Sequence, residues 1–282
     1  MKRIVARCLL LVSGFMISLT TSDQQLETAF AVEVQPSRLE LTISTDQPAQ
    51  AKLQVINPSQ KAVHVRIQTG PYRFLDPGIP MPSAEGWFSF EPESFILAPS
   101  ATSEVTLHVA PPDNVARDTA GEYVAAILID EMPADNDERP AGEPRAKITI
   151  IPRFALPVYL MIQGRELIRV ELAEASVRST AFSLDKGGQP LLRAEAILRN
   201  SGSVHVRPTG TLTILHKEGG LYQAHTLGKS LPLLPGGRLT IPAVLPLPPV
   251  GFYKAIITIE PNPGQMLQKE IPFEVTSQGE IR

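Results

Sequence analysis

Short runs of alternating apolar and polar residues recur along this chain, and most of them end at turn-forming residues. In the first half such runs cover residues 38–43, 52–55, 63–67 and 105–109. In the second half they cover residues 191–198, 204–215, 238–245, 252–259 and 271–275. A period of two is the spacing of a strand with one buried face, and turn residues about every ten positions are typical of β-sandwiches. The sequence therefore predicts an all-β protein.

The prolines and glycines mark the turns between strands, and the length of the chain fits two sandwiches. The 27 prolines and 19 glycines separate the alternating runs instead of gathering in one tract, so they act as turn residues. The stretch that comes nearest to an amphipathic helix is Glu166–Thr180, and its Val and Leu residues alternate as well as they follow a helical period. We expect a boundary near Gln163–Glu166, which gives domains 32–163 and 164–282 of ordinary size.

The first 31 residues have the pattern of an export signal. A basic start precedes an apolar run at residues 8–19, and Ala29–Ala31 forms an A-x-A cleavage signal. The alternative is an uncleaved anchor, but a run of about twelve residues is shorter than the roughly 20 that a spanning helix needs. We therefore predict a signal peptide at residues 1–31 and an exported mature chain with no membrane span. The mature chain has no cysteine, because Cys8 is the single cysteine.

Two long apolar strands are predicted between Gly121 and Ile162, and residues 134–144 form the polar loop between them. The second of these strands is unusually long and apolar. A strand of this kind at the edge of a sheet invites another chain to pair with it. This hairpin is therefore the candidate working part of the molecule.

No catalytic or metal-binding pattern is found in the sequence. The five histidines lack ligand spacing, and neither a nucleophile elbow nor a Gly-rich phosphate loop occurs. A net charge of −3 without a basic stripe also argues against a nucleic-acid partner. We therefore expect a protein that is not an enzyme and needs no cofactor or metal. Two alternatives stay open: the loop with Asp135, Asp137 and Glu138 is a solvated face or a calcium site, and Trp87–Phe90 is core or an interface patch.

Four segments then occur in a fixed order. Pro36–Leu41 is a strand with an arginine after a turn, and Leu53–Pro58 is a strand that ends in Asn-Pro. Tyr123–Pro133 closes with an acidic, aliphatic and proline run, and Leu156–Leu160 lies where the hairpin ends. Together these segments, over about residues 32–162, resemble the N-terminal domain of the PapD-like periplasmic pilus-assembly chaperones. The resemblance implies two immunoglobulin-like β-sandwich domains in tandem.

The resemblance also implies a subunit-binding site. Chaperones of this family lend an edge strand to a pilin that lacks one, and two basic residues bind the carboxylate at the subunit's C-terminus. Arg38 matches the first basic position, and a guanidinium can bind a carboxylate bidentately. The second position falls near Leu156, and the nearest basic residue is Arg153.

Ile148, Ile150 and Phe154 would be the residues donated to the subunit, and they lie on one face of the predicted strand. The alternative is that these side chains fill the protein's own core. Pro152 interrupts the strand, so the strand can serve as a donor only if the missing N–H faces away from the guest.

We thus expect a non-enzymatic periplasmic chaperone that binds an exported, pilin-like subunit or another envelope protein. The alternative is an exported structural or adhesive module of the cell envelope, which the same double sandwich fits. The two differ in whether the strand that contains Ile148 and Phe154 can be reached by a guest.

Overall fold

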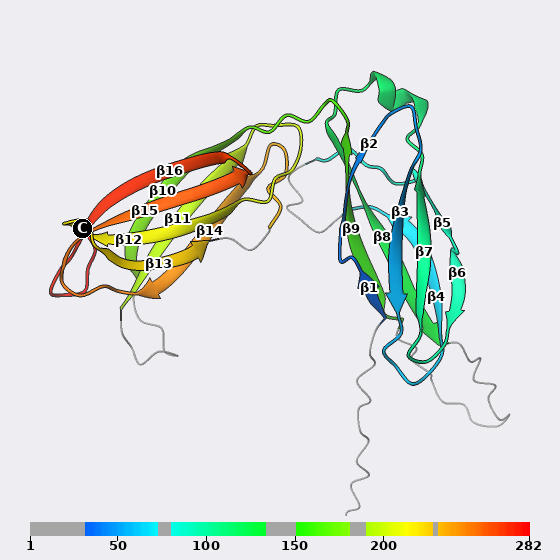
Figure 1. Ribbon diagram of the computed structural model, residues 1–282, viewed down its shortest axis with the longest axis horizontal. Helices are drawn as coiled ribbons and strands as arrows, with labels where there is room; N and C mark the ends of the chain where they lie inside the picture. The colour runs from blue at the N-terminus through cyan, green and yellow to red at the C-terminus, as the bar shows by residue number, and fades with distance from the viewer. Residues whose placement is uncertain (1–31, 73–79, 134–150, 181–189, 228–230) are drawn as a thin grey trace, which may run out of the picture. The chain divides into compact units, whose positions relative to one another are not determined.

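The computed structural model describes residues 32–72, 80–133, 151–180, 190–227 and 231–282 (Figure 1). In these residues the chain forms strands and a short 3₁₀ helix. The bounds are β1 Glu33–Gln35, β2 Leu39–Ile43, β3 Ala49–Ile56, β4 Val63–Gly70, β5 Phe88–Glu91, β6 Ser94–Leu97, β7 Thr102–Val109, η1 Asp113–Arg117, β8 Glu122–Pro133, β9 Arg153–Ile162, β10 Val170–Thr180, β11 Leu191–Asn200, β12 Thr209–His216, β13 Leu221–Leu227, β14 Arg238–Pro246, β15 Gly251–Asn262 and β16 Gln265–Val275.

The strands up to β9 form a first sandwich of two sheets. One sheet has the order β1-β3-β7-β5 and the other has the order β2-β9-β8-β4-β6. The chain passes from the first sheet to the second between β1 and β2, so β1 pairs with β3 while β2 runs parallel to β9. This crossing decides which part of β9 has a neighbour.

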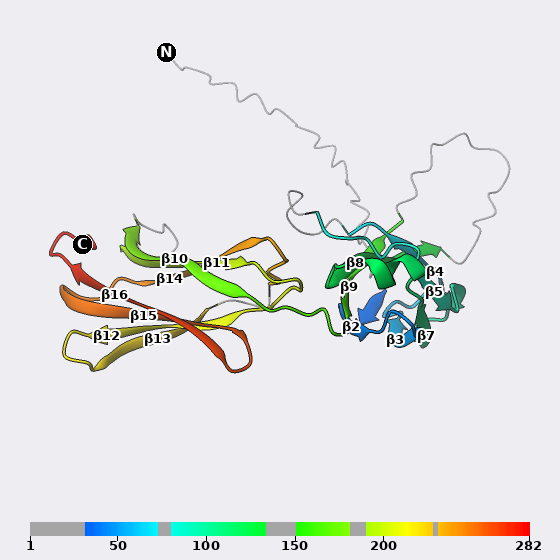
Figure 2. The same cartoon turned by 90° about the horizontal axis from the view of Figure 1, so that it is seen from above.

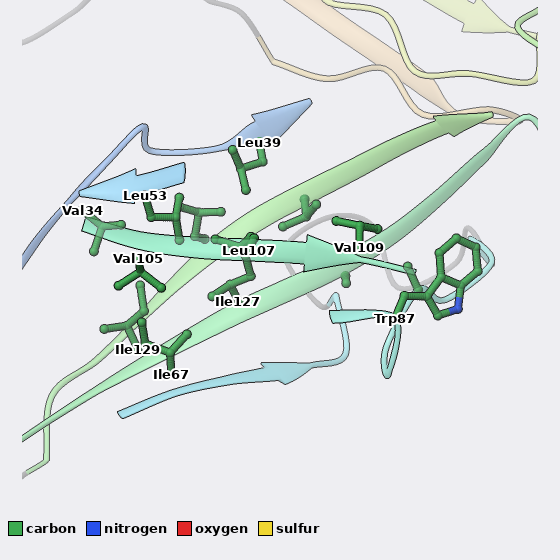
Figure 3. Close-up of a cluster of buried hydrophobic side chains, with 14 of the residues drawn as sticks. Val34, Leu39, Leu53, Ile67, Trp87, Val105, Leu107, Val109, Ile127 and Ile129 are labelled. Atoms are coloured by element: carbon green, nitrogen blue, oxygen red, sulfur yellow. The ribbon is translucent and has the colours of Figure 1, made fainter. Parts of the chain in front are cut away.

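The alternating runs place their apolar residues between these two sheets. Leu53, Val105, Leu107 and Ile127 are fully buried there and come from strands of both sheets (Figure 3). Burying such side chains removes apolar surface from water, which is the main favourable contribution to folding. Trp87 belongs to the same core at 8% exposure, and its ring lies 4.6 Å from that of Tyr123. The core alternative for Trp87 is therefore the correct one.

The strands from β10 onward form a second sandwich. A sheet of order β10-β11-β14 faces a sheet of order β13-β12-β15-β16 (Figure 2). Their core includes Leu192, Leu198, Leu212 and Ile257, all fully buried. The hairpin between β12 and β13 turns at Gly219, whose φ of 97° is a conformation that glycine adopts without strain.

The predicted fold class is confirmed, since the described chain consists of two immunoglobulin-like β-sandwiches in tandem. The stretch Glu166–Thr180 is a strand from Val170 onward, not a helix. One run differs from its prediction: alternation begins at Val204, but β12 begins at Thr209. Val206 makes only an isolated bridge to Leu233, because the segment before Pro208 is held by other contacts described below. No helix in the described ranges is long and apolar enough to cross a membrane.

Candidate functional site

Strand β9 has one fully paired edge and one half-paired edge. Along its paired edge β8 runs antiparallel to it from Arg153 to Met161. Along the other edge β2 pairs only with Val158–Ile162. Among the residues that the structure describes, no strand pairs with the other edge of β9 over Arg153–Pro157. We call these five positions the open half of β9.

The backbone hydrogen bonds show which groups face the open edge. The N–H of Ile162 donates to the carbonyl of Gly121 at 2.8 Å, and the carbonyl of Pro152 accepts from the N–H of Glu131 at 3.1 Å. The backbone N–H and C=O groups of even-numbered residues in this stretch therefore face β8. The N–H of Gln163, in contrast, donates to Ile43 at the end of β2 at 2.9 Å. Odd-numbered residues thus face the other edge, because backbone groups alternate in direction along a strand.

Because of this alternation, the missing N–H groups of Pro152 and Pro157 face opposite edges of the strand. Pro152 is even-numbered, so its missing N–H faces β8 and not the open edge. The N–H groups of Arg153 and Ala155, together with their carbonyls, point outward from the open half. Pro157 is odd-numbered, so it presents a carbonyl but no donor where β2 begins. A donor strand with a proline requires that the missing N–H faces away from the guest. Pro152 fulfils this requirement.

The side chains of β9 divide between the core and the opposite face of the sheet. Leu156, Val158 and Leu160 are fully buried in the first core. Phe154 lies on the same face and packs partly buried against that core. Leu156, the position that the resemblance gave to a second basic residue, is therefore a core residue. Ile148 and Ile150 lie outside the described residues.

Arg153 binds an acid of its own sheet. Its Nε donates to Asp130 Oδ1 at 2.5 Å and its Nη2 to Oδ2 at 3.0 Å. Arg66 and Gln68 on β4 also donate to Asp130 Oδ2, at 3.2 and 3.1 Å. The hydrogen bond from Arg153 is the main cause that holds the pKa of Asp130 below its usual value. Asp130 thereby ties the first residue of β9 to β8 and β4.

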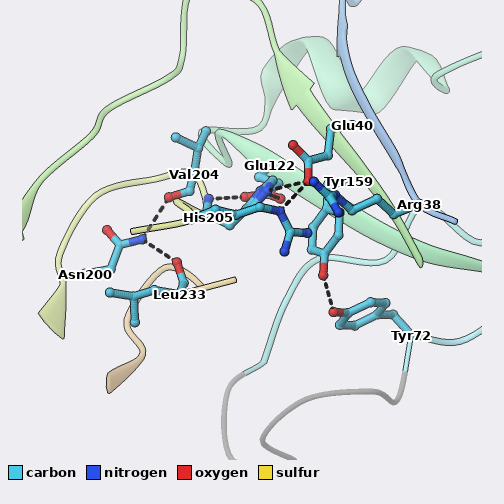
Figure 4. A network of polar contacts seen from close by, with 10 residues as sticks. Arg38, Glu40, Tyr72, Glu122, Tyr159, Asn200, Val204, His205 and Leu233 are labelled. Carbon is cyan, nitrogen blue, oxygen red and sulfur yellow. Dashed lines mark hydrogen bonds and ion pairs between the residues drawn. The ribbon is translucent and has the colours of Figure 1, made fainter. Parts of the chain in front are cut away.

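Arg38 takes part in a different cluster. Its Nε donates to Glu40 Oε1 at 2.8 Å, and the Nε of Arg207 donates to the same oxygen at 2.5 Å (Figure 4). Partial burial raises the pKa of Glu40, but the hydrogen bonds and positive charge of Arg207, His205 and Arg38 outweigh it and lower that pKa overall. Two guanidinium groups therefore converge on one carboxylate.

The structure does not bring Arg38 and Arg153 together. Leu39 pairs with Val158, so Arg38 lies level with Pro157, four residues along β9 from Arg153. At a rise of about 3.3 Å per residue this is a separation of about 13 Å along the strand. The second cation near Arg38 is Arg207 instead.

Sequence reasoning missed the residues next to this cluster. The backbone N–H of His205 donates to Glu122 Oε2, and its Nδ1 lies 2.6 Å from Glu122 Oε1 (Figure 4). The His205 ring lies 4.2 Å from the ring of Tyr159, whose hydroxyl bonds with that of Tyr72 at 2.5 Å. The sequence offered one weak signal, which is an acid at the start of the otherwise apolar run 122–129.

A shallow hollow lies beside the cluster. Its volume is about 350 Å³, and its lining includes Glu40, Met161, His205, Arg207 and Pro263. Among the described residues no three histidine, cysteine or acidic side chains are grouped as a metal site would require. The acidic residues Asp135, Asp137 and Glu138 lie outside those residues.

No protein-family model matches this sequence, and a search of curated proteins finds no match. Many solved structures do match, and they include two chaperones and a complex of a chaperone with a pilin. The Escherichia coli chaperone DraB is 13% identical, with a TM-score of 0.39 over 86% of this chain and 96% of that chain. The Pseudomonas aeruginosa chaperone CupB2 is also 13% identical, with a TM-score of 0.39 over 84% and 98%. A chain from the Salmonella enterica complex of the SafA pilin with the SafB chaperone is 12% identical, with a TM-score of 0.40 over 86% and 97%. The likeness to these proteins concerns the fold.

Proposed function

We propose that this chain is a non-enzymatic periplasmic chaperone that binds an exported, pilin-like subunit by pairing the open half of β9 with a strand of that subunit. The observation that carries the proposal is the half-paired edge of β9. The N–H groups of Arg153 and Ala155 face this edge without a strand partner among the described residues, whereas the missing N–H of Pro152 faces β8. Unpaired backbone groups at a sheet edge are a template for an added strand.

The remaining predicted residues receive roles within this proposal. Ile148 and Ile150 would extend the donated strand upstream of Phe154, towards the guest's open core. Arg38 would mark the end of the added strand, since it lies level with Pro157 where β2 begins. Arg153 would hold the start of β9 against β8 through Asp130, so that the open half keeps a fixed position. Residues 1–31 would direct export and be removed.

A substitution at Ala155 tests the pairing directly. Ala155→Pro removes an N–H that faces the open edge and leaves the hydrogen bonds between β9 and β8 in place. Ala155→Ser keeps the N–H and serves as the matched control. Each mature protein would be immobilised and exposed to a periplasmic extract of the source bacterium, and bound proteins would be identified by mass spectrometry. We expect the wild type and Ala155→Ser to retain one exported β-rich subunit, and Ala155→Pro to retain at least about tenfold less.

Thermal melting of all three proteins shows whether each is folded. If Ala155→Pro does not melt cooperatively, hydrogen exchange of the wild-type complex decides instead, because the amides of Arg153 and Ala155 must become protected when the subunit binds. Equal subunit binding by a folded Ala155→Pro would contradict edge pairing. Retention of cell-wall material without any subunit would favour the alternative of an envelope-binding module.

A further inference from the structure

The imidazole of His205 lies between two carboxylates. Its Nδ1 is 2.6 Å from Glu122 Oε1, and its Nε2, on the other side of the ring, is 3.6 Å from Glu40 Oε1. The side chain of His205 is 3% exposed and that of Glu122 is fully buried. Such a pair is rarely buried unless it is both hydrogen-bonded and compensated in charge.

The hydrogen bonds of Glu122 bear on whether the proton between Nδ1 of His205 and Oε1 of Glu122 is carried by the nitrogen. One oxygen of this carboxylate accepts the backbone N–H of His205, and the other lies next to Nδ1. With Glu122 as an ionised carboxylate, both of its oxygens accept and Nδ1 of His205 donates. In a neutral ring with a proton on Nδ1, the lone pair of Nε2 would face Glu40. Only the imidazolium form places an N–H on both sides.

Of the other groups around the His205 ring, some oppose its positive charge and others favour it. Arg38 and Arg207 bind Glu40 and reduce its attraction for a proton on Nε2, and the charge of Arg207 also opposes a second cation nearby. The ring of Tyr159 on β9 lies against the imidazole at 4.2 Å, and an aromatic face attracts a cation. Glu122, buried at the start of β8, has His205 as its hydrogen-bonded ionisable partner. The positive charge of the imidazolium would compensate the negative charge of this buried carboxylate.

These contacts join parts of the chain that belong to different cores. Glu40, Glu122 and Tyr159 come from strands of the first sandwich, whereas His205 and Arg207 lie in the segment that leads into β12. An apolar cluster of Val124, Tyr159 and Leu234 joins the same parts. We propose that His205 is a proton-dependent latch. Its imidazolium form holds the segment Val204–Arg207 against β8 and β9, and loss of the proton at higher pH loosens this contact. The latch does not depend on the proposed subunit binding.

Nitrogen NMR of the histidine rings tests the protonation step. In the mature chain with ¹⁵N-labelled histidine we expect both ring nitrogens of His205 to carry protons at about pH 6, and one of them to lose its proton as the pH rises towards about 9. His205→Gln assigns the signal, and His225, exposed on β13, is the reference in the same spectra. Glu122→Gln should lower the pH at which the proton is lost, whereas Glu104→Gln, exposed on β7, should leave it unchanged. A neutral His205 ring throughout this range would overturn the proposal.

A distance measurement tests the consequence. The mature chain has no cysteine, so spin labels can be attached to Gln54→Cys on β3 and Gln268→Cys on β16, both exposed positions. We expect a narrow distance distribution at about pH 6 that broadens at about pH 9 in the wild type. In His205→Gln, which cannot carry the charge, the width should be the same at both pH values. A wild-type distribution that does not change with pH would show that the His205 proton is not what holds the two parts together.

Discussion

Replacing Asn200 with alanine should destabilise the second sandwich. Asn200 is the last residue of β11 and is fully buried. Its amide nitrogen donates to the carbonyls of Val204 at 2.9 Å and Leu233 at 3.0 Å, and its amide oxygen accepts from the N–H of Gly202 at 2.8 Å. One side chain therefore satisfies two backbone groups of the loop that leads to His205 and one of the segment between β13 and β14.

The expected cost follows from these three bonds. A hydrogen bond contributes about 1 kcal/mol net, and a buried group left without a partner costs about 1–3 kcal/mol. The Leu233 carbonyl also accepts from the N–H of Val206 at 3.1 Å, so it keeps a partner in the variant. We therefore expect Asn200→Ala to lower the free energy of unfolding by about 2–3 kcal/mol. Asn200→Asp keeps the acceptor for Gly202 but places a buried carboxylate oxygen against the carbonyls of Val204 and Leu233, so it should cost at least as much as Asn200→Ala.

Guanidinium denaturation can assign the loss to one sandwich. Trp87 is the single tryptophan and lies in the first core, so its fluorescence reports on the first sandwich, whereas circular dichroism reports on both. The Asn200→Ala shift should appear mainly in the circular-dichroism transition. Ser201→Ala, at an exposed neighbour, is the matched control and should change little. A loss below about 1 kcal/mol for Asn200→Ala would refute the argument that this side chain satisfies buried backbone groups.

Three further predictions concern the first sandwich. The hydrogen bond from Arg153 lowers the pKa of Asp130 in the folded state, so this ion pair stabilises the fold above the unfolded carboxyl pKa of about 4, and that contribution disappears as the pH falls through the folded value. Denaturation between about pH 6 and 3 should therefore show a flatter loss of stability for Asp130→Asn than for the wild type, and parallel curves would speak against the pair. Leu156→Ala should cost about 2–5 kcal/mol in chemical denaturation because the side chain is fully buried, and a near-neutral result would mean that β9 is not anchored in the core. Burial and the hydrogen bond to Asp118 raise the pKa of Tyr123 to about 12, so ultraviolet titration of Tyr123→Phe should lose a step near pH 12, well above the value of about 10 for a free tyrosine.

The fold could be predicted because several strands alternate between a buried and a more exposed face. Val63, Val65 and Ile67 alternate with polar residues in the sequence, and the three apolar side chains are buried at 6%, 0% and 0% exposure. The prediction was wrong for the first part of the run Val204–Leu215, although that part alternates equally well. There the side chain of Asn200 takes the Val204 carbonyl, and Glu122 takes the N–H of His205, so this backbone does not continue the strand.

The candidate site was predicted only in part, because its contacts join residues far apart in the chain. Arg38 and Arg153 could be chosen as basic residues near the expected edge. Each proves to be bound to an acid of the chain itself, Glu40 and Asp130, and nothing in local spacing indicates these pairs beyond the i, i+2 relation of Arg38 to Glu40. The partners His205 and Glu122 are 83 residues apart, a distance over which neither periodicity nor turn signals carry information.

The strand register shows which edge of β9 the missing N–H of each proline faces, which the sequence alone does not show. On sequence alone, a proline within or beside an apolar run lowers the expectation of a paired strand. The structure puts Pro152 just before β9 with its missing donor towards β8, and Pro157 with its missing donor towards the edge that β2 leaves unpaired. Neither proline interrupts the ladder between β8 and β9 over Arg153–Met161. Pro157 also means that an added strand can gain outward-facing donors from this strand only before that residue. The open half of β9 therefore has a defined end, and a guest strand that pairs with it can extend only in the direction of Arg153.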